Sequence, residues 1–297
     1  MILKTILKLN AVCTIVLLGS VLVFAQSDDK NVQLRYDFKE GNRQNYSMSI
    51  DGSVVVEVSS RSGLPLPSNN AKMQGEFTYA HEVTAVNPKD KSANINVVYG
   101  KSYMNTIINN QVIPNPDIPL LDGKIAQVTV AANGEVKDFK LPSTLPLSLQ
   151  NADFRKMFVV FPERILRPGE SWFENRETTD DDNENFSTVN TINSKYTLLG
   201  VEKKGNYKCA KVKFESVSNS KTKSKNPDLI MDGNIDGKVE GIIYYNLDNG
   251  TVVHSDLSTK IENLLVSGKK GNEQDTQKVE QIKTVVNTDL HIITELL

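Results

Sequence analysis

The sequence is poor in the residues on which small secreted domains and many enzymes depend. It has two cysteines, three histidines and one tryptophan in 297 residues. Cys13 lies in an N-terminal apolar run, so Cys209 is the one cysteine left for the fold and no intramolecular disulfide is expected. Cys209 sits in a strand-like run of apolar neighbours, which favours a buried structural thiol over a nucleophile. The chain must therefore be held together by core burial, and about 270 residues suffice for that.

Sequence motifs for catalysis are also missing. There is no Gly-x-Ser-x-Gly elbow, phosphate-binding loop, dinucleotide fingerprint or His-Glu-x-x-His. The histidines, His81, His254 and His291, fall in three separate predicted strands without the short spacing of a metal site, so we expect them to be solvated or hydrogen-bonded. We predict no catalytic, cofactor-binding or metal-binding residue and no enzyme, with a hydrolase built from dispersed residues as an open alternative.

An excess of positive charge is absent as well. The formal net charge is −2, and it falls to about −4 if Lys4 and Lys8 are removed with an N-terminal segment. Nucleic-acid binding calls for a basic face, so a nucleic-acid partner is not expected.

The N-terminus carries the pattern of an export signal. A basic start is followed by an apolar run over Ala11–Phe24, and Val23-Phe24-Ala25 resembles a cleavage site. The run is shorter than the roughly 20 residues that span a bilayer. We therefore predict a cleaved signal over residues 1–25, no membrane span afterwards, and a periplasmic or extracellular protein. An uncleaved anchor is the alternative.

The rest of the chain has the alternation of β-strands. Val32–Phe38 and Val279–Leu290 alternate between apolar and polar residues, and Asn133-Gly134 and Asn249-Gly250 predict tight hairpin turns. Short turns throughout predict a mainly β protein with twelve to fourteen mostly antiparallel strands. The interruptions expected are a loop at Ser59–Asn70, an irregular connection at Asn109–Pro119, a polar mobile segment at Ser218–Asp228 and a helix at Leu149–Val160.

Three landmarks recur in the same order in the two halves of the chain. They pair Lys39–Gly41 with Arg167–Gly169, Val86–Val97 with Val201–Val212, and Gly123–Val136 with Gly237–Val252. This order predicts an internal duplication, with two similar curved antiparallel sheets and one or two short helices between them. The expected parts are an N-terminal β half (26–147), a helical junction (148–166) and a C-terminal β half (167–297).

Three local patterns have competing interpretations. Asp232–Gly237 reproduces the start of a calcium loop, but Ile243 occupies the place of its closing Glu, so a glycine-rich turn is preferred. The acidic run Asp180–Glu184 is expected to be a solvated loop. Trp172 is expected to fill the core end of a sheet rather than to serve as an exposed aromatic platform.

A family resemblance rests on three short motifs. They are Tyr36, Phe38 and Gly41 at the opening, Phe161-Pro162 with Pro168–Trp172 in the centre, and the strand Leu199–Glu202. These motifs resemble a family of exported β-rich proteins of diderm bacteria that has no assigned activity. The resemblance covers most of the chain after residue 25 and implies architecture and compartment but no site residues. There is a more distant similarity, at the level of fold alone, to lipoprotein carriers, in which a half-barrel shelters acyl chains.

Two main hypotheses follow for the function. The first is a non-catalytic exported β protein that binds an apolar or amphiphilic ligand on the concave face of its sheets. The second is an envelope or extracellular interaction module with a solid core, which would use the loops 59–75 and 174–186. An apolar cavity would favour the first hypothesis, and a filled core the second. Neither the ligand, the partner nor the oligomeric state can be read from the sequence.

Overall fold

All the strands belong to a single sheet. The computed structural model describes residues 31–60, 69–116, 118–142, 158–180, 186–225, 229–269 and 281–297. In these residues the chain forms twelve strands and one short 3₁₀ helix, η1, at Ile118–Leu121. The strands are β1 (Arg43–Ser60), β2 (Asn69–Val86), β3 (Ala93–Ile108), β4 (Gln111–Pro114), β5 (Ile125–Val130), β6 (Val136–Lys140), β7 (Ser171–Asp180), β8 (Phe186–Lys204), β9 (Tyr207–Ser224), β10 (Leu229–Asn246), β11 (Val252–Lys269) and β12 (Gln281–Leu296).

The prediction of two separate sheets is wrong. The strand order is β6-β5-β3-β2-β1-β12-β11-β10-β9-β8-β7, with β4 added beside β3, and the pairings are antiparallel. The first and last long strands, β1 and β12, pair from Tyr46–Leu296 to Ser60–Ile282. This ladder fuses the two halves of the chain in the middle of the sheet, so no sheet edge separates them.

The hairpins and most strands are where the sequence predicts them. The turns at Asn133-Gly134 and Asn249-Gly250 join β5 to β6 and β10 to β11. Two predicted interruptions contain strand residues, because β9 continues to Ser224 opposite β10, and β4 pairs with β3 inside the expected irregular connection. Strand propensity alone does not predict these two segments, because their stability comes from pairing with the neighbouring strands.

Some predictions concern residues beyond those described. Residues 1–25, the predicted signal, lie outside the described residues, as do 61–68 and 181–185 of the expected loops. Of the predicted helix at Leu149–Val160, only residues 158–160 are described, and they are not helical. The interaction loops 59–75 and 174–186 are also corrected in part, because 69–75 and 174–180 are strand.

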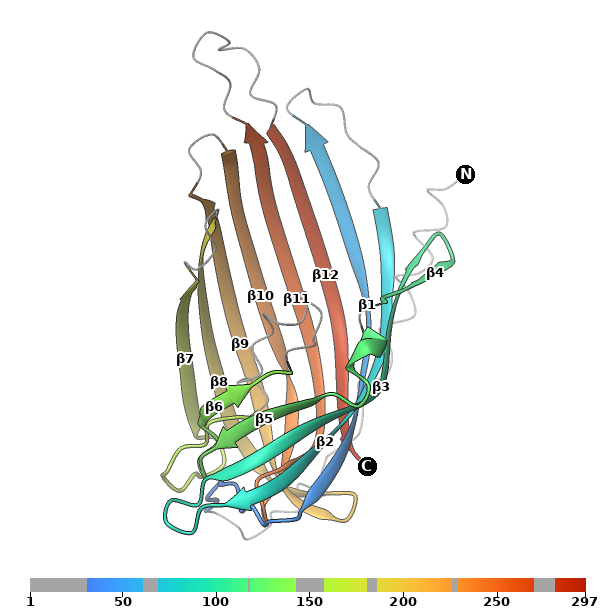
Figure 1. The fold of residues 1–297 in the computed structure, drawn as a ribbon. Coiled ribbons are helices and arrows are strands. Elements are labelled where there is room, and N and C mark those ends of the chain that lie inside the picture. The colour runs from blue at the N-terminus through green and yellow to red at the C-terminus, as the bar shows by residue number, and fades with distance from the viewer. Residues whose placement is uncertain are drawn as a thin grey trace, which may run out of the picture.

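The sheet curves strongly into a trough (Figure 1). The long strands β1, β2 and β8–β12 stand side by side, and β3, β5 and β6 sweep across the lower part of the view. Register shifts occur at Phe77/Tyr79, Val83/Ala85, Thr129/Val130, Leu198/Gly200 and Tyr244/Tyr245. Since each bulge adds bend and twist to its strand, these irregularities near one end of the sheet help to curl it there.

Glycines on the concave side make room for this curvature. The side of the sheet that faces the core is called the inner face here, and Gly233, Gly237 and Gly241 of β10 lie on it. A Cβ built at Gly241 would collide with the carbonyl oxygen of Asp256, and one at Gly237 would collide with the hydroxyl of Ser218. Of the two glycines in the calcium-like pattern, Gly237 therefore serves close packing within a strand, whereas a Cβ at Gly233 would make only ordinary contacts.

The hydrophobic core fills one end of the trough. Two segments cross the inner face there, 32–38 and 158–166, and they meet in an isolated bridge between Val32 and Leu166. The alternation of the first segment correctly predicts burial of Val32, Leu34 and Tyr36, but only Val32 pairs as a bridge and the segment does not join the sheet. Both flanks of the sheet contribute to this core, since Val97 and Val130 belong to one buried cluster with Leu198 and Val212.

Candidate functional site

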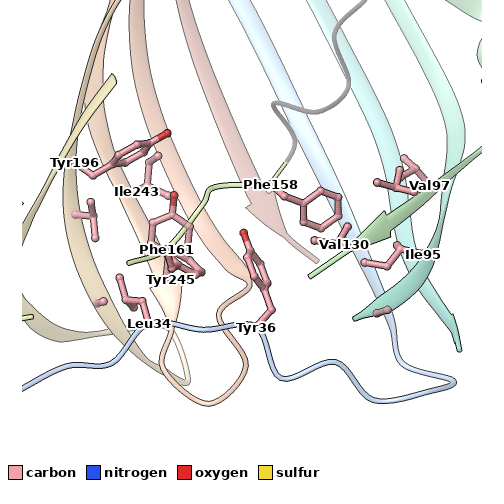
Figure 2. Packing of buried hydrophobic residues seen from close by; sticks show 14 of the residues in the cluster. Leu34, Tyr36, Ile95, Val97, Val130, Phe158, Phe161, Tyr196, Ile243 and Tyr245 are labelled. Carbon is pink, nitrogen blue, oxygen red and sulfur yellow. The ribbon is translucent and has the colours of Figure 1, made fainter. Parts of the chain in front are cut away.

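An apolar pocket opens on the inner face where the core ends. Its volume is about 480 Å³, within the usual range for small-molecule sites. Strands β1, β2, β3, β10, β11 and β12 supply most of its walls, and the crossing segments supply Tyr36, Phe38, Phe158 and Val159. Figure 2 shows Tyr36, from the N-terminal segment, between Phe158 on one side and the group of Phe161 and Tyr245 on the other.

The pocket wall carries no charged side chain. No Asp, Glu, Lys or Arg is found among the described residues that line it. Its polar groups are uncharged hydroxyls and an amide, together with an imidazole: Tyr36, Gln44, Tyr46, Tyr79, His81, Tyr99, Tyr245, Thr251, Ser255 and Thr294. A buried charge without a partner is strongly unfavourable, so this lining suits an uncharged guest.

His81 is enclosed by aromatic rings within this wall. Its ring centroid lies 5.2 Å from that of Phe158, 5.1 Å from that of Tyr46 and 5.4 Å from that of Tyr79. Desolvation by these neighbours lowers the pKa of His81 to about 4, so the imidazole is neutral at neutral pH. Its Nε2 atom is inaccessible and has no hydrogen-bond partner in the described part of the chain. Nε2 of His81 therefore departs from the expectation of a solvated or hydrogen-bonded histidine.

Tyr245 presents a second unpaired polar atom. Its side chain is fully buried and packs edge-on against Phe161, with ring centroids 5.0 Å apart. Its hydroxyl has no hydrogen-bond partner among the residues described, and burial raises its pKa well above the usual value. Most buried polar groups in proteins have a hydrogen-bond partner, so two unpaired polar atoms in the wall of one pocket are unusual.

The pocket continues into a long uncharged wall. Residues opposite each other in an antiparallel ladder share a face, so the register defines the inner face along the whole sheet. From Tyr46 to Val58 on β1, a length of about 40 Å, and at the partner positions of β2 and β8–β12, the described inner face carries no Asp, Glu, Lys or Arg. Its half-buried apolar members include Ile50, Val54, Val56, Leu257, Ile261, Leu265, Val286, Leu290 and Ile292.

The outer face, on the opposite side of the sheet, carries charged side chains. Lys211, Lys213 and Glu215 alternate along β9, and Lys238 and Glu240 pair on β10. On the described inner face, an ion pair between Glu174 and Arg176 lies on β7, at the edge of the sheet. The division of charge between the two faces is therefore nearly complete.

The other two histidines lie on the outer face and do not form a catalytic group. His254 Nδ1 contacts Glu295 at 2.6 Å, and His291 Nε2 contacts Asp256 at 2.7 Å, as the expectation of hydrogen-bonded histidines requires. Ser258 is opposite His291 in the ladder, yet no hydrogen bond joins them in the described structure, and the His291 and Asp256 side chains are about half exposed. A hydrolase site in a cleft gains no support from these groups.

The calcium-like pattern lies within a strand. Asp232, Asn234 and Asp236 lie on the outer face of β10, in an extended strand and not in a loop that wraps around an ion. Asp236 instead accepts hydrogen bonds from the amides of Asn219 and Asn234. Within the described residues, no group of three or more His, Cys, Asp or Glu side chains is placed to hold a metal ion.

Two predictions about single residues are confirmed. Trp172 is buried, stacks on Tyr196 at 5.0 Å, and donates its indole N–H to the Val160 carbonyl at 3.1 Å, as expected of a core residue. Cys209 is fully buried. Sequence reasoning missed the pocket itself, although Phe77, Tyr79 and His81 alternate along β2 and so place an aromatic stripe on one face.

Comparisons with known proteins give little further information. No family model and no curated protein matches the chain. Three crystal structures show a weak likeness, each over 86% of this chain: Pseudomonas aeruginosa OccK7 (OpdD) over 99% of that chain (6% identity, TM-score 0.20), Pseudomonas aeruginosa OpdQ over 99% (8%, 0.19), and Acinetobacter baumannii OccAB4 over 98% (6%, 0.16). Among the described residues, none of the helices is long and apolar enough to cross a membrane.

Proposed function

We propose that this chain is a non-catalytic exported protein that binds an apolar or amphiphilic ligand in the concavity of its sheet. The observation that carries the proposal is the continuity between the pocket and the uncharged inner face. The pocket would take one end of the ligand, and the wall formed by β1, β12 and β11 would shelter the rest from water.

The energetics of the wall support this proposal. Burial of apolar surface contributes about 25 cal/mol per Å², so a chain lying along the half-buried Val54, Leu290 and Ile292 would gain from each contact. A solvated sheet face usually carries polar side chains, as the outer face does here. Extended uncharged faces with many apolar side chains are characteristic of binding surfaces. The predicted export signal supplies the proposed location, in the periplasm or outside the cell.

The cavity favours a ligand over the alternative of a solid-core interaction module. A segment of an envelope protein laid along the wall would nevertheless bury the same residues. The two occupants differ in mass and in solubility, and one experiment separates them.

Native mass spectrometry of protein purified from the envelope fraction without detergent tests the proposal. We expect a bound mass of small-molecule size that is lost after organic extraction and reappears in the organic phase. A clean ligand-free mass across several preparations would overturn the proposal. A co-purifying polypeptide that survives extraction would replace the ligand with a protein partner.

A further inference from the structure

We propose that the ligand is an electrically neutral amphiphile whose hydroxyl group pairs with an unpaired polar atom of the pocket wall, either His81 Nε2 or the Tyr245 hydroxyl. This inference rests on the proposed function and specifies the chemical class of the ligand. Long-chain alcohols, monoacylglycerols and hydroxylated terpenoids belong to that class, whereas fatty-acid anions, phospholipids and cationic surfactants do not.

The described pocket lining offers no counter-charge to an ionic head group. A carboxylate, phosphate or ammonium group in the pocket would leave water without meeting an opposite charge, because the described lining contains neither acidic nor basic residues. The cost of burying an unpaired ion exceeds the gain from sheltering a short apolar tail. A neutral head group avoids this cost.

The pocket wall also contains two polar atoms that need a hydrogen-bond partner. The Nε2 atom of His81 and the hydroxyl of Tyr245 are both buried in the pocket wall, and neither has a hydrogen-bond partner in the described structure. A hydroxyl both donates and accepts, so it can pair with either tautomer of the imidazole or with the phenol. A hydrocarbon without a polar group would leave both atoms unsatisfied.

The protonation state of the His81 imidazole also favours a neutral ligand. Desolvation lowers the pKa of His81 to about 4, and the rings of Tyr46, Tyr79 and Phe158 that cause it surround the imidazole. At neutral pH His81 therefore offers one donor and one acceptor and no positive charge. It recognises a neutral hydroxyl and gives no counter-ion to an acid.

A displacement series with one chain length tests the inference. Purified protein is stripped of lipid on a hydrophobic resin and loaded with Nile red, and its fluorescence is followed during titration with 1-dodecanol, dodecanoate, dodecyltrimethylammonium or dodecane at pH 7.5. We expect 1-dodecanol to displace Nile red at concentrations at least tenfold below those of both ions. Equal or tighter binding of dodecanoate would overturn the inference.

Two conservative variants assign the head group to its partners. His81→Phe and Tyr245→Phe keep an aromatic ring but remove the polar atom, and the variant that lacks the partner of the hydroxyl should weaken 1-dodecanol binding about tenfold while leaving dodecane unchanged. His291→Phe on the outer face is the matched control and should change neither. Equal losses for 1-dodecanol and dodecane in both pocket variants would contradict the assignment. If Nile red and all four probes fail to bind, the proposed function itself fails, whereas binding without head-group preference overturns only this inference.

Discussion

The hydroxyl of Tyr36 accepts a hydrogen bond from the backbone N–H of Val159 at 3.2 Å. This contact joins two segments that are far apart in the sequence, and both residues line the pocket. The Tyr36 ring also packs against Phe158 and Phe161, with centroid distances of 5.9 and 4.9 Å. Tyr36 therefore holds the floor of the pocket as well as the end of the core.

Substitutions at Tyr36 should show how much its contacts contribute to the free energy of unfolding. Tyr36→Phe loses one hydrogen bond and should lower the free energy of unfolding by about 1 kcal/mol, and Tyr36→Ala should lower it by about 3–5 kcal/mol. Urea unfolding followed by the fluorescence of Trp172, the one tryptophan, gives both values. Tyr103→Phe, at a side chain that is 48% exposed, should stay within about 0.5 kcal/mol of the parent. Equal stability of all three variants would exclude a structural role for Tyr36.

The buried imidazole of His81 should make stability depend on pH. Its pKa is about 4 in the folded protein, against about 6.5 in an unfolded chain. Between these values the unfolded chain takes up a proton that the folded protein does not, so the stability present above pH 6.5 is lost as the pH falls towards 4. The loss should amount to about 2 kcal/mol.

Urea unfolding at pH 7.5 and 4.5 tests this dependence against His81→Phe. Carboxylates also titrate in this range, so the relevant quantity is the difference between the two proteins. The stability of His81→Phe should fall by about 2 kcal/mol less than that of the parent. Parallel pH profiles for the two proteins would show that His81 is protonated or solvated in the folded state.

The unpaired hydroxyl of Tyr245 should be a small liability in the ligand-free protein. Its removal in Tyr245→Phe should leave the free energy of unfolding unchanged or raise it by about 1 kcal/mol, because no hydrogen bond is lost and an unsatisfied group disappears. The free energies of unfolding of the lipid-stripped parent and of lipid-stripped Tyr245→Phe are compared to measure the change. A loss above about 1 kcal/mol would reveal a hydrogen bond at this hydroxyl.

Two glycines on the same face of β10 should respond differently to alanine. Gly241→Ala forces a Cβ into the backbone of Asp256 and should cost about 1–3 kcal/mol. Gly233→Ala meets Thr222 and Leu265 at ordinary contact distances of 3.5 and 3.6 Å and should be nearly neutral. Thermal unfolding of the pair tests whether close packing at the curved inner face requires glycine. Equal melting temperatures would contradict this account of the curvature.

The sequence predicts local features of this fold better than its global arrangement. Alternation and Asn-Gly turns place β5, β6, β10 and β11, because hairpins depend on contacts between neighbours in the sequence. The pairing of β1 with β12 joins strands from the two ends of the chain, and nothing local specifies it. The segment 32–38 shows the same limit, since its alternation indicates burial but does not distinguish a sheet strand from a segment crossing the core.

The candidate site likewise depends on contacts between residues that are far apart in the sequence. The neutrality of the pocket depends on which residues of distant strands share a face, and the sequence alone does not give the register. His81 illustrates this point, because its unpaired state results from Tyr46 on another strand and Phe158 on a crossing segment. His254 and His291, by contrast, have carboxylate partners on the outer face, where polar strand residues are expected.

The central claim is that the inner face, and not the outer face, holds the ligand. Ile292 and Ile293 are adjacent on β12, both half-buried, and point to opposite faces of the sheet. Native mass spectrometry of Ile292→Glu and Ile293→Glu, purified without detergent from the envelope fraction, compares the two faces directly. The account predicts that Ile292→Glu loses the bound mass and that Ile293→Glu retains it. Retention in Ile292→Glu together with loss in Ile293→Glu would contradict the account and place the ligand on the outer face.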